Sequence, residues 1–460
     1  MQKLISPRHI EICKFAFYIK ILVIAAKSKF NLIINKECSV IMISKLKALK
    51  TNPVVIVVLI FGVISLFGDL VYEGARGANS QYFNLLGISA AKVGLVFGIG
   101  EFLGYFFRLI AGILSDKSKK PWLFIFIGYA MLISVQIIGL TQNWNFIAIL
   151  ILMERLGKSL RNPAKDTVLS GVVSSSDNPD NKIGIGIAFG IQEALDQLGA
   201  FGGPLIFTLV FALTGRADIK EYQLGYRFLI IPFILLMLFL IFAYNKVKKH
   251  NLIPSITTDD FHSESLSPVF WIYTAFTFFS TLGFVNFSII GYHLKDKCIL
   301  NDWQITLIYS GAMAIDALGA LIVGRSYDLL KNKKRAKMGG LALLLLIPVL
   351  SMMLPIFTLS YSVPLIILGM IIFGFILGLH ETIMRSAIAD LTPFHKRGTS
   401  YGIFNASYGL ALLGGSAIIG WLYDQGLNVW ITGMALVAEL IALILFYSMY
   451  KKVTMQSKFK

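Results

Sequence analysis

The stretch Gly112-Ile-Leu-Ser-Asp116 is matched by Gly324-Arg-Ser-Tyr-Asp328, in which the glycine and the aspartate return 212 positions later. At the same offset, the glycines at 190, 202 and 203 recur as Gly402, Gly414 and Gly415. Between these matches, Arg161 and Asp166 recur with their own spacing as Arg385 and Asp390, at an offset of 224. The 12 additional residues fall largely in loops, where insertions are tolerated. An ordered set of matches predicts a chain built from two similar halves.

The composition is that of a membrane protein. The 460 residues are 56% hydrophobic and only 15% charged, and the mean hydropathy is +0.73. These values exclude a soluble enzyme of this length. Apolar runs of about 20 residues or more recur along the chain, and a helix of that length crosses a hydrocarbon core of roughly 30 Å.

These runs predict an all-α integral membrane protein with twelve transmembrane helices, in two six-helix bundles related by a pseudo-twofold axis. The predicted spans are 53–80, 90–114, 121–140, 145–169, 183–212 and 224–245, then 268–293, 303–329, 338–358, 364–390, 399–422 and 428–450. We expect a basic N-terminal segment over 1–50, a first bundle over 51–245, a linker over 246–267, a second bundle over 268–452 and a tail over 453–460. Parallel repeats of this size are typical of secondary transporters that bind substrate near the bilayer midplane.

Basic residues follow alternate groups of spans and so predict the orientation. They are Lys117, Lys119, Lys120, Lys246, Lys248, Lys249, Lys331, Lys333, Lys334, Arg335, Lys337, Lys396, Arg397, Lys451 and Lys452. By the positive-inside rule, both termini and the linker are cytoplasmic in a multi-pass protein of the cell (inner) membrane. The net charge of +17 therefore reports topology. We expect the lipid bilayer and no nucleic acid as a partner, since no basic run belongs to a soluble module.

The first 41 residues have three interpretations. Lysines interrupt their apolar stretches, so no clean span of about 20 residues forms. The segment can lie amphipathically on the inner leaflet, with its lysines toward anionic headgroups. It can be a disordered tail, or translation can begin at Met42, directly before a basic flank and the first span. We favour the start at Met42.

The loop after the second span carries a recognisable motif. Its residues are Gly112, Asp116, Lys117 and Lys120, with Gly324 and Asp328 in the second copy. Glycine lets neighbouring helices approach closely, and an aspartate at a helix end can accept hydrogen bonds from the N-terminus of another helix. The pattern resembles the signature loop of the major facilitator superfamily, which implies a gating role. Lys119 stands where that family has a turn glycine, and an ordinary basic loop is the alternative.

The fourth span reads Glu154-Arg155-Leu-Gly157-Lys158-Ser-Leu-Arg161-Asn-Pro163-Ala-Lys165-Asp166. A charge at the bilayer centre costs a few kcal/mol, so these side chains must face protein or water. The string resembles a fourth-helix motif of a prokaryotic branch of the same superfamily, Glu-Arg-x-Gly-Lys-x-x-Arg-x-Pro-x-Arg-Asp, with Lys165 in place of an arginine.

The fifth span resembles the same branch. It reads Phe189-Gly190-x-x-Glu193-Ala-x-Asp196-x-x-Gly199-Ala and continues to Gly202-Gly203-Pro204. A glycine-rich run before a proline is also found in helix five of the superfamily's antiporters. The resemblance covers about residues 50–452 and implies twelve helices and transport, with a modest indication of export.

Charged residues also share helix faces in the first two spans. Asp69, Tyr72, Glu73 and Arg76 are three or four residues apart and so lie on one face. We expect Glu73 to pair with Arg76, and Asp69 to find a partner in the second span, where Glu101 and Arg108 share a face. The alternative is a set of ion pairs that fix helix register, although buried pairs rarely gain net stability over apolar packing.

The two halves differ in chemistry, because the positions equivalent to Asp69 and Tyr72 are Phe284 and Phe287. The first half therefore looks like the ion-handling side, and the aromatic seventh span looks like a wall for the substrate. The residues predicted for proton coupling or substrate binding are Asp69, Tyr72, Glu73, Arg76, Glu101, Arg108, Glu154, Arg155, Glu193, Asp196, Glu381 and Arg385. Asp69 is the first choice for proton carrier, being deep in its span, and Glu193 is the second.

These observations predict a monomeric secondary transporter of a small organic molecule, coupled to protons and working by alternating access. Export is the favoured direction, and proton-coupled uptake of a polar metabolite is the alternative. From other classes, we consider a membrane-embedded lipid-modifying enzyme using Asp259, Asp260 and His262, and a transport-dead sensor. Three scattered cysteines lack metal or disulfide spacing. We expect no enzyme activity, no cofactor and no metal site.

Overall fold

The computed structural model describes residues 53–174, 185–249, 266–331, 339–392 and 397–456, and all regular structure in these ranges is helical. Residues 1–50, most of the 246–267 linker with Asp259, Asp260 and His262, and residues 457–460 lie outside the described part. The interpretations of residues 1–41 and the predicted domain limits therefore stay predictions.

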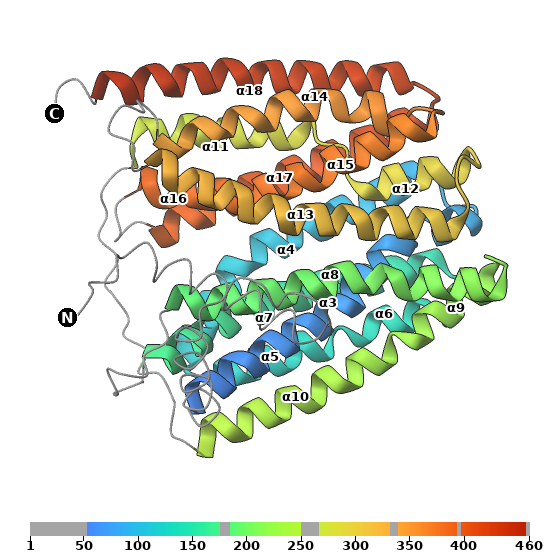
Figure 1. Cartoon of the computed structure of the whole chain (residues 1–460), viewed down its shortest axis with the longest axis horizontal. Coiled ribbons are helices and arrows are strands. Elements are labelled where there is room, and N and C mark those ends of the chain that lie inside the picture. The colour runs from blue at the N-terminus through green and yellow to red at the C-terminus, as the bar shows by residue number, and fades with distance from the viewer. Residues whose placement is uncertain (1–52, 175–184, 250–265, 332–338, 393–396, 457–460) are drawn as a thin grey trace, which may run out of the picture.

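Six spans form the first bundle (Figure 1). They are α3 (Pro53–Leu85), α4 (Ala90–Ser118), the pair α5 (Pro121–Ala130) and α6 (Ile133–Ile138), α7 (Trp144–Ser174), α8 (Ile185–Thr214), and the pair α9 (Ile219–Phe228) and α10 (Ile230–Lys249). Helix α3 is the centre of this bundle, because it packs along α8 and α10.

Six further spans form the second bundle. They are the pair α11 (Pro268–Leu282) and α12 (Phe287–Asp296), α13 (Asp302–Lys331), the 3-10 helix η2 (Gly339–Leu345) with α14 (Leu346–Thr358), α15 (Val363–Leu379) with the π-helix η3 (His380–Met384) and α16 (Arg385–Leu391), α17 (Arg397–Asp424) and α18 (Asn428–Gln456). The predicted fold of twelve helices in two bundles is confirmed.

Eleven spans of the described chain are long and apolar enough to cross a membrane, and α7 is the twelfth. Helix α7 fails that criterion because it carries the charged string predicted to face inward. Glu154, Arg155, Arg161 and Lys165 are indeed buried inside the protein. Buried partners take the place of water for these charges, so α7 belongs in the bundle despite its composition.

The predicted seventh span is not one continuous helix. It breaks between α11 and α12 at residues 283–286, and the backbone of this break turns toward the interior, where Phe284 and Asn286 line a cavity. Irregular backbone at membrane depth is tolerated where it is enclosed by protein or lines a cavity. The span predicted over 268–293 is present, and it consists of two helices.

The repeat in the sequence is accompanied by a repeat of helix–helix contacts. A Cβ at Gly203 would lie 2.7 Å from the Leu70 carbonyl oxygen, and a Cβ at Gly415 would lie 2.5 Å from the Leu282 carbonyl oxygen. Each glycine thus lets the fifth helix of its half lie directly on the first helix. Leu70 and Leu282 are themselves 212 positions apart, as are the two glycines. The halves therefore share one packing arrangement.

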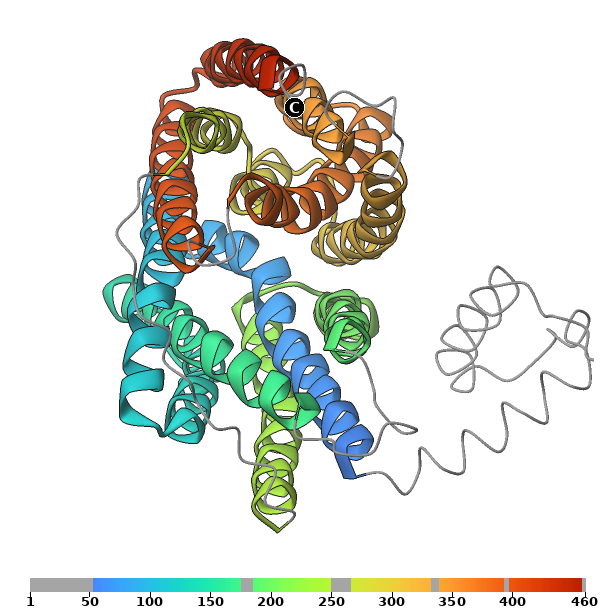
Figure 2. The ribbon, with the colours of Figure 1, turned by 90° about the vertical axis from the view of Figure 1, so that its left-hand side faces the viewer.

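The two bundles lie side by side (Figure 2). We call the end at which α3 begins and α18 ends the terminal end, and the opposite end, with Leu85, Ala90 and Asp424, the distal end (Figure 1). Between the bundles, α4 packs on α17, α8 on α13, and α3 on α12. These contacts enclose a space along the axis between the bundles.

Candidate functional site

A cavity of about 260 Å³ lies between the two bundles. Ten of the predicted coupling or substrate residues line it, namely Asp69, Tyr72, Glu73, Arg76, Glu101, Arg108, Arg155, Glu193, Asp196 and Glu381. Glu154 lies beside it in a smaller neighbouring cavity. The side chain of Arg385 is outside the described part of the structure. The fold thus gathers the predicted residues, whose functional roles stay predictions.

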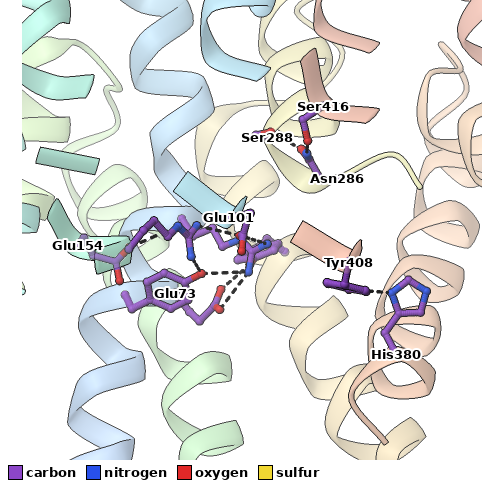
Figure 3. Close-up of polar contacts among 12 residues, drawn as sticks. Glu73, Glu101, Glu154, Asn286, Ser288, His380, Tyr408 and Ser416 are labelled. Carbon is purple, nitrogen blue, oxygen red and sulfur yellow. Dashed lines mark hydrogen bonds and ion pairs between the residues drawn. The ribbon is translucent and has the colours of Figure 1, made fainter. Parts of the chain in front are cut away.

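Charges of the first bundle form a network around two arginines (Figure 3). Arg155 is only 3% exposed and forms salt bridges with Glu101 at 3.2 Å and with Glu154 at 3.5 Å. Arg76 forms salt bridges with Glu101 at 3.6 Å and, as predicted, with Glu73 at 3.4 Å. Pairing of this kind is what makes buried charge tolerable in a membrane interior. Glu101 therefore joins α3 and α7 through α4.

Tyr72 is the aromatic centre of this network. Its hydroxyl accepts a hydrogen bond from Arg155, and the Lys158 ammonium nitrogen lies 4.0 Å from the centroid of its ring. A cation over an aromatic face is attracted by the negative π-surface. The ring thus holds a lysine for which no carboxylate lies within salt-bridge distance among the described residues.

The predicted contact between Asp69 and the second span is wrong. Asp69 forms no salt bridge with Arg108, whose guanidinium lies 5.1 Å from the ring centroid of Tyr105. The reason is the packing of α8 against α3, because a Cβ at Gly199 would lie 3.1 Å from the Asp69 Cβ. The charged neighbours of Asp69 are consequently Asp196 in α8, Lys158 and Arg161 in α7, and Glu73 in α3 itself.

Hydrogen bonds cross between the bundles at the cavity. The Tyr309 hydroxyl of α13 donates a hydrogen bond to Glu73 Oε2 at 2.5 Å. The Gln197 amide of α8 donates to Glu193 at 3.5 Å and to Glu381 at 3.4 Å. Carboxylates of the first half are therefore tied to the second half. Tyr309 was not identifiable from the sequence, since one tyrosine in an apolar span carries no signal.

The bundles are joined more firmly at the distal end. Asp424 at the end of α17 accepts hydrogen bonds from the backbone N–H groups of Ala90 at 2.8 Å and Ala91 at 2.9 Å, at the start of α4. A carboxylate at a helix N-terminus is favoured by the unpaired amides and by the helix dipole. A separate contact joins α8 to α13, where the hydroxyls of Thr208 and Thr306 lie 2.8 Å apart.

A second distal contact is made by Asp302 at the start of α13. It accepts hydrogen bonds from the Tyr222 hydroxyl of α9 and, at 2.8 Å, from the Lys295 ammonium group. The Tyr222 hydroxyl also contacts Gln81 of α3 at 3.1 Å. The cavity thus lies on the terminal side of a join between the bundles.

The second bundle also contributes polar groups to the cavity, and their pairing could not be predicted from the sequence. His380 in η3 contacts the Tyr408 hydroxyl at 3.1 Å, and the Asn286 amide donates to Ser416 at 2.5 Å (Figure 3). Asp316 of α13 is 4% exposed, and its Oδ1 atom has no hydrogen-bond partner. Asp316 lies in the middle of an apolar span, but its place in the cavity could not be predicted from the sequence.

Glu439 of α18 lies outside this cavity and was missed by the sequence analysis. Its side chain is fully buried, and neither carboxyl oxygen has a hydrogen-bond partner. The hydroxyls of Ser280 and Ser351 face it. Among the residues that the structure describes, no group of three or more histidine, cysteine or acidic side chains is arranged to hold a metal ion.

The two gating motifs are only partly described. Gly112 faces Pro163 of α7 and Gly324 faces Thr382 of η3, so each glycine lies beside the fourth span of its own half. Lys119 has a φ of +54°, which explains why a glycine suits this turn. Lys117 and Lys120 are exposed. The side chains of Asp116 and Asp328 lie outside the described part, so the gating role stays a prediction.

Comparison with known sequences gives extensive matches. The sequence model of the Major Facilitator Superfamily matches residues 54–411 and 301–459. An uncharacterized protein of Mycobacterium tuberculosis is 32% identical over 397 residues, which covers 85% of this chain and 92% of that protein. An uncharacterized MFS-type transporter of Methanocaldococcus jannaschii is 28% identical over 157 residues, or 34% of this chain and 37% of that protein.

Solved structures share the fold at low sequence identity. A bacterial homolog of the human lysosomal transporter Spinster, in an inward-facing and occupied conformation, has a TM-score of 0.62 at 13% identity, covering 87% of this chain and 96% of that one. The nucleoside transporter NupG has a TM-score of 0.61 at 13% identity, covering 85% and 98%.

Proposed function

This chain belongs to the Major Facilitator Superfamily and is a membrane transporter rather than an enzyme, and we propose that it uses a proton gradient to move a small polar organic molecule by alternating access. The observation that supports this most directly is the charged cavity between the bundles. Its walls come from both halves, so the contacts of a ligand bound there would change whenever one half rocks against the other.

Proton coupling requires a carboxylate whose surroundings change as the bundles move. Asp69 is our candidate, because its charged neighbours Asp196 and Lys158 lie on two other helices. A shift of α7 or α8 against α3 would move Lys158 or Asp196 and change the proton affinity of Asp69. Each conformation would then favour a different protonation state, which is the basis of coupling. Glu193, tied to Glu381 through Gln197, is the second candidate.

We propose the cytoplasmic side of the cell membrane for the terminal end, with the protein acting as a monomer. The lysine distribution supports this orientation, since Lys246, Lys248 and Lys249 close α10 at that end. In intact cells, a single cysteine placed at position 255 should react with a membrane-impermeant reagent only after the membrane has been permeabilised. Labelling from the outer face alone would reverse the orientation.

Export is the proposed direction, supported by the glycine-rich run before Pro204 in α8. Uptake of a polar metabolite is a second candidate, which the charged lining of the cavity favours over the export of apolar compounds. A comparison of metabolites in cells with and without the protein would identify the ligand. The direction of its pH-gradient-driven flux in vesicles would decide between the two and would exclude a transport-dead sensor.

The coupling test compares Asp69→Asn with the unchanged protein in vesicles. We expect the substitution to abolish pH-gradient-driven flux and to spare substrate exchange without a gradient, because the amide keeps the size of the side chain but carries no proton. The matched control is Glu439→Gln, a buried carboxyl outside the cavity, which should retain both activities. If both activities survive in Asp69→Asn, Asp69 is not the carrier. Loss of both in a folded protein would assign it to structure or substrate binding.

A further inference from the structure

Asp316 and Lys158 line the cavity from opposite bundles, and neither forms a salt bridge with a described residue. Asp316 of α13 is 4% exposed, and its Oδ1 atom has no hydrogen-bond partner. Lys158 of α7 rests on the ring of Tyr72 and forms no salt bridge with a described carboxylate. Both residues line the same cavity. An unpaired buried charge is unfavourable, so each group is a place where a ligand of opposite charge would gain affinity.

The surroundings give each group a distinct electrostatic setting. On the acidic side, Glu193 of α8 and Glu381 of η3 are neighbours of Asp316 in the cavity and are bridged by Gln197. On the basic side, Arg76 and Arg155 are already bound by glutamates.

Two more cations line the cavity: Lys165 donates a hydrogen bond to the Ser65 hydroxyl at 2.9 Å, and Arg108 lies on the ring of Tyr105. Lys158 contacts the ring of Tyr72 and forms no hydrogen bond or salt bridge with a described residue, so it is the cation most available to a ligand. The carboxylates of Asp69 and Asp196 are its acidic neighbours, but neither forms a salt bridge with it. The cavity thus presents an acidic wall that spans α8, α13 and η3, and a lysine on α7.

We propose that the substrate is a small zwitterion, whose cationic group binds the Asp316 carboxyl group while its anionic group binds the Lys158 ammonium group. This inference rests on the proposed transport function, which makes the cavity the substrate-binding site. A molecule with one charge would satisfy one group and leave the other unpaired in a site of low dielectric constant. Discrimination against a ligand that lacks one partner is strong in such sites, because the unmatched protein group loses its water without replacement.

The placement on two bundles adds a mechanical consequence. Lys158 belongs to the first bundle and Asp316 to the second. A zwitterion bound to both would connect the two halves across the cavity, as Tyr309 and Glu73 already do further along α3. Binding would then favour a conformation in which the halves are drawn together, since a ligand stabilises the state that it contacts best.

The test measures binding to the purified full-length protein by thermal stabilisation, without any gradient. The probes are ω-amino acids from glycine to 8-aminooctanoate, which vary the separation of the two charges. Alkylamines and alkyl carboxylates of matched chain length carry one charge each, and sodium chloride is compared with potassium chloride. We expect stabilisation by at least one ω-amino acid at concentrations where both singly charged analogues give none.

Variants then assign the two ends of the ligand. In Asp316→Asn, we expect the affinity for the zwitterion to fall by roughly tenfold or more, and in Lys158→Gln by a similar factor. Glu439→Gln controls for loss of a buried carboxyl outside the cavity, and Lys92→Gln controls for loss of an exposed lysine. Neither control should change the affinity. Circular dichroism and the unliganded melting temperature show whether each variant is folded.

Several outcomes would overturn the proposal. They are no stabilisation by any ω-amino acid, equal stabilisation by a singly charged analogue, and an affinity unchanged in folded Asp316→Asn and Lys158→Gln. Sodium-specific stabilisation that is lost in Asp316→Asn, without an effect of the zwitterions, would assign this carboxylate to an inorganic cation instead. If the protein binds the zwitterion but does not carry it into vesicles, the zwitterion is a ligand of the cavity and the proposed transport of it is refuted.

Discussion

Removing the carboxylate of Asp424 should open the distal end of the protein. This side chain joins the bundles by accepting two hydrogen bonds from the first amides of α4, at 2.8 and 2.9 Å. Loss of an acceptor at a helix N-terminus costs about 0.5–2 kcal/mol, and loss of the charge from the helix dipole costs about 0.3–1 kcal/mol. Asp424→Ala should therefore weaken the distal join by about 1–3 kcal/mol. Because 1.4 kcal/mol is a factor of ten, the population of the open state rises roughly 5- to 150-fold.

A cysteine that is buried in the closed state and labelled only in the open state can measure this rise in the open population, whatever fraction of the unchanged protein is open. Ser80 of α3 is fully buried against Gly291 of α12, and its hydroxyl has no hydrogen-bond partner, so Ser80→Cys sacrifices no bond. When closing is faster than alkylation, the labelling rate is proportional to the open population. The native cysteines are first removed. Cys298, whose φ is +49°, is best replaced by asparagine, which tolerates the left-handed conformation.

The expected order of labelling rates is Asp424→Ala, then Asp424→Asn, then the unchanged residue, because asparagine keeps an acceptor but loses the charge. Ser267→Ala is the matched control. Ser267 caps α11 at the terminal end, where its hydroxyl accepts a hydrogen bond from the Phe270 N–H at 3.2 Å within one bundle, so its removal should lower stability without changing the labelling of Ser80→Cys. Equal labelling rates in Asp424→Ala and the unchanged protein would refute the idea that this carboxylate holds the distal end closed.

Three further predictions concern packing, the bridge between the bundles, and gating. Tyr309→Phe keeps the ring but removes the hydrogen bond to Glu73. Such a bond to a charged acceptor contributes about 1.5–3 kcal/mol, so the labelling rate of Ser80→Cys should rise roughly tenfold or more. An unchanged labelling rate would contradict this prediction. Gly203→Ala places a Cβ 2.6 Å from a backbone nitrogen of α3 and should lower the free energy of unfolding by about 1–3 kcal/mol. Gly190 has open space around it, so Gly190→Ala should not lower the melting temperature. Equal melting temperatures for the two variants would contradict this prediction. Asp116→Asn should impair flux in a folded protein and Asp328→Asn should do less, since only the first loop has the basic pattern; equal effects would mean that the resemblance of the loop is superficial.

The class of the protein, the number of spans and the two-fold repeat could all be predicted from the amino-acid sequence. Each of these follows from quantities that add up along the chain, such as the transfer free energy of an apolar run. Even α7 could be placed, because its charges exclude contact with lipid and so require a position inside the bundle. Helix periodicity placed Asp69 and Glu73 on one face of the first span, and both line the cavity.

The pairs of side chains that meet in the interior could not be predicted in this way, because they depend on how the helices pack. Asp69 faces α8 rather than Arg108 because the small residue Gly199 lets α8 approach α3 there. Arg155 contacts Glu101, Tyr309 reaches Glu73 and Asp424 caps α4 across large separations in the chain. The partner of a charge depends on how each helix is rotated about its axis and how near its neighbours come. Those quantities are set by the packing of all the helices together, and no local pattern in the sequence encodes them.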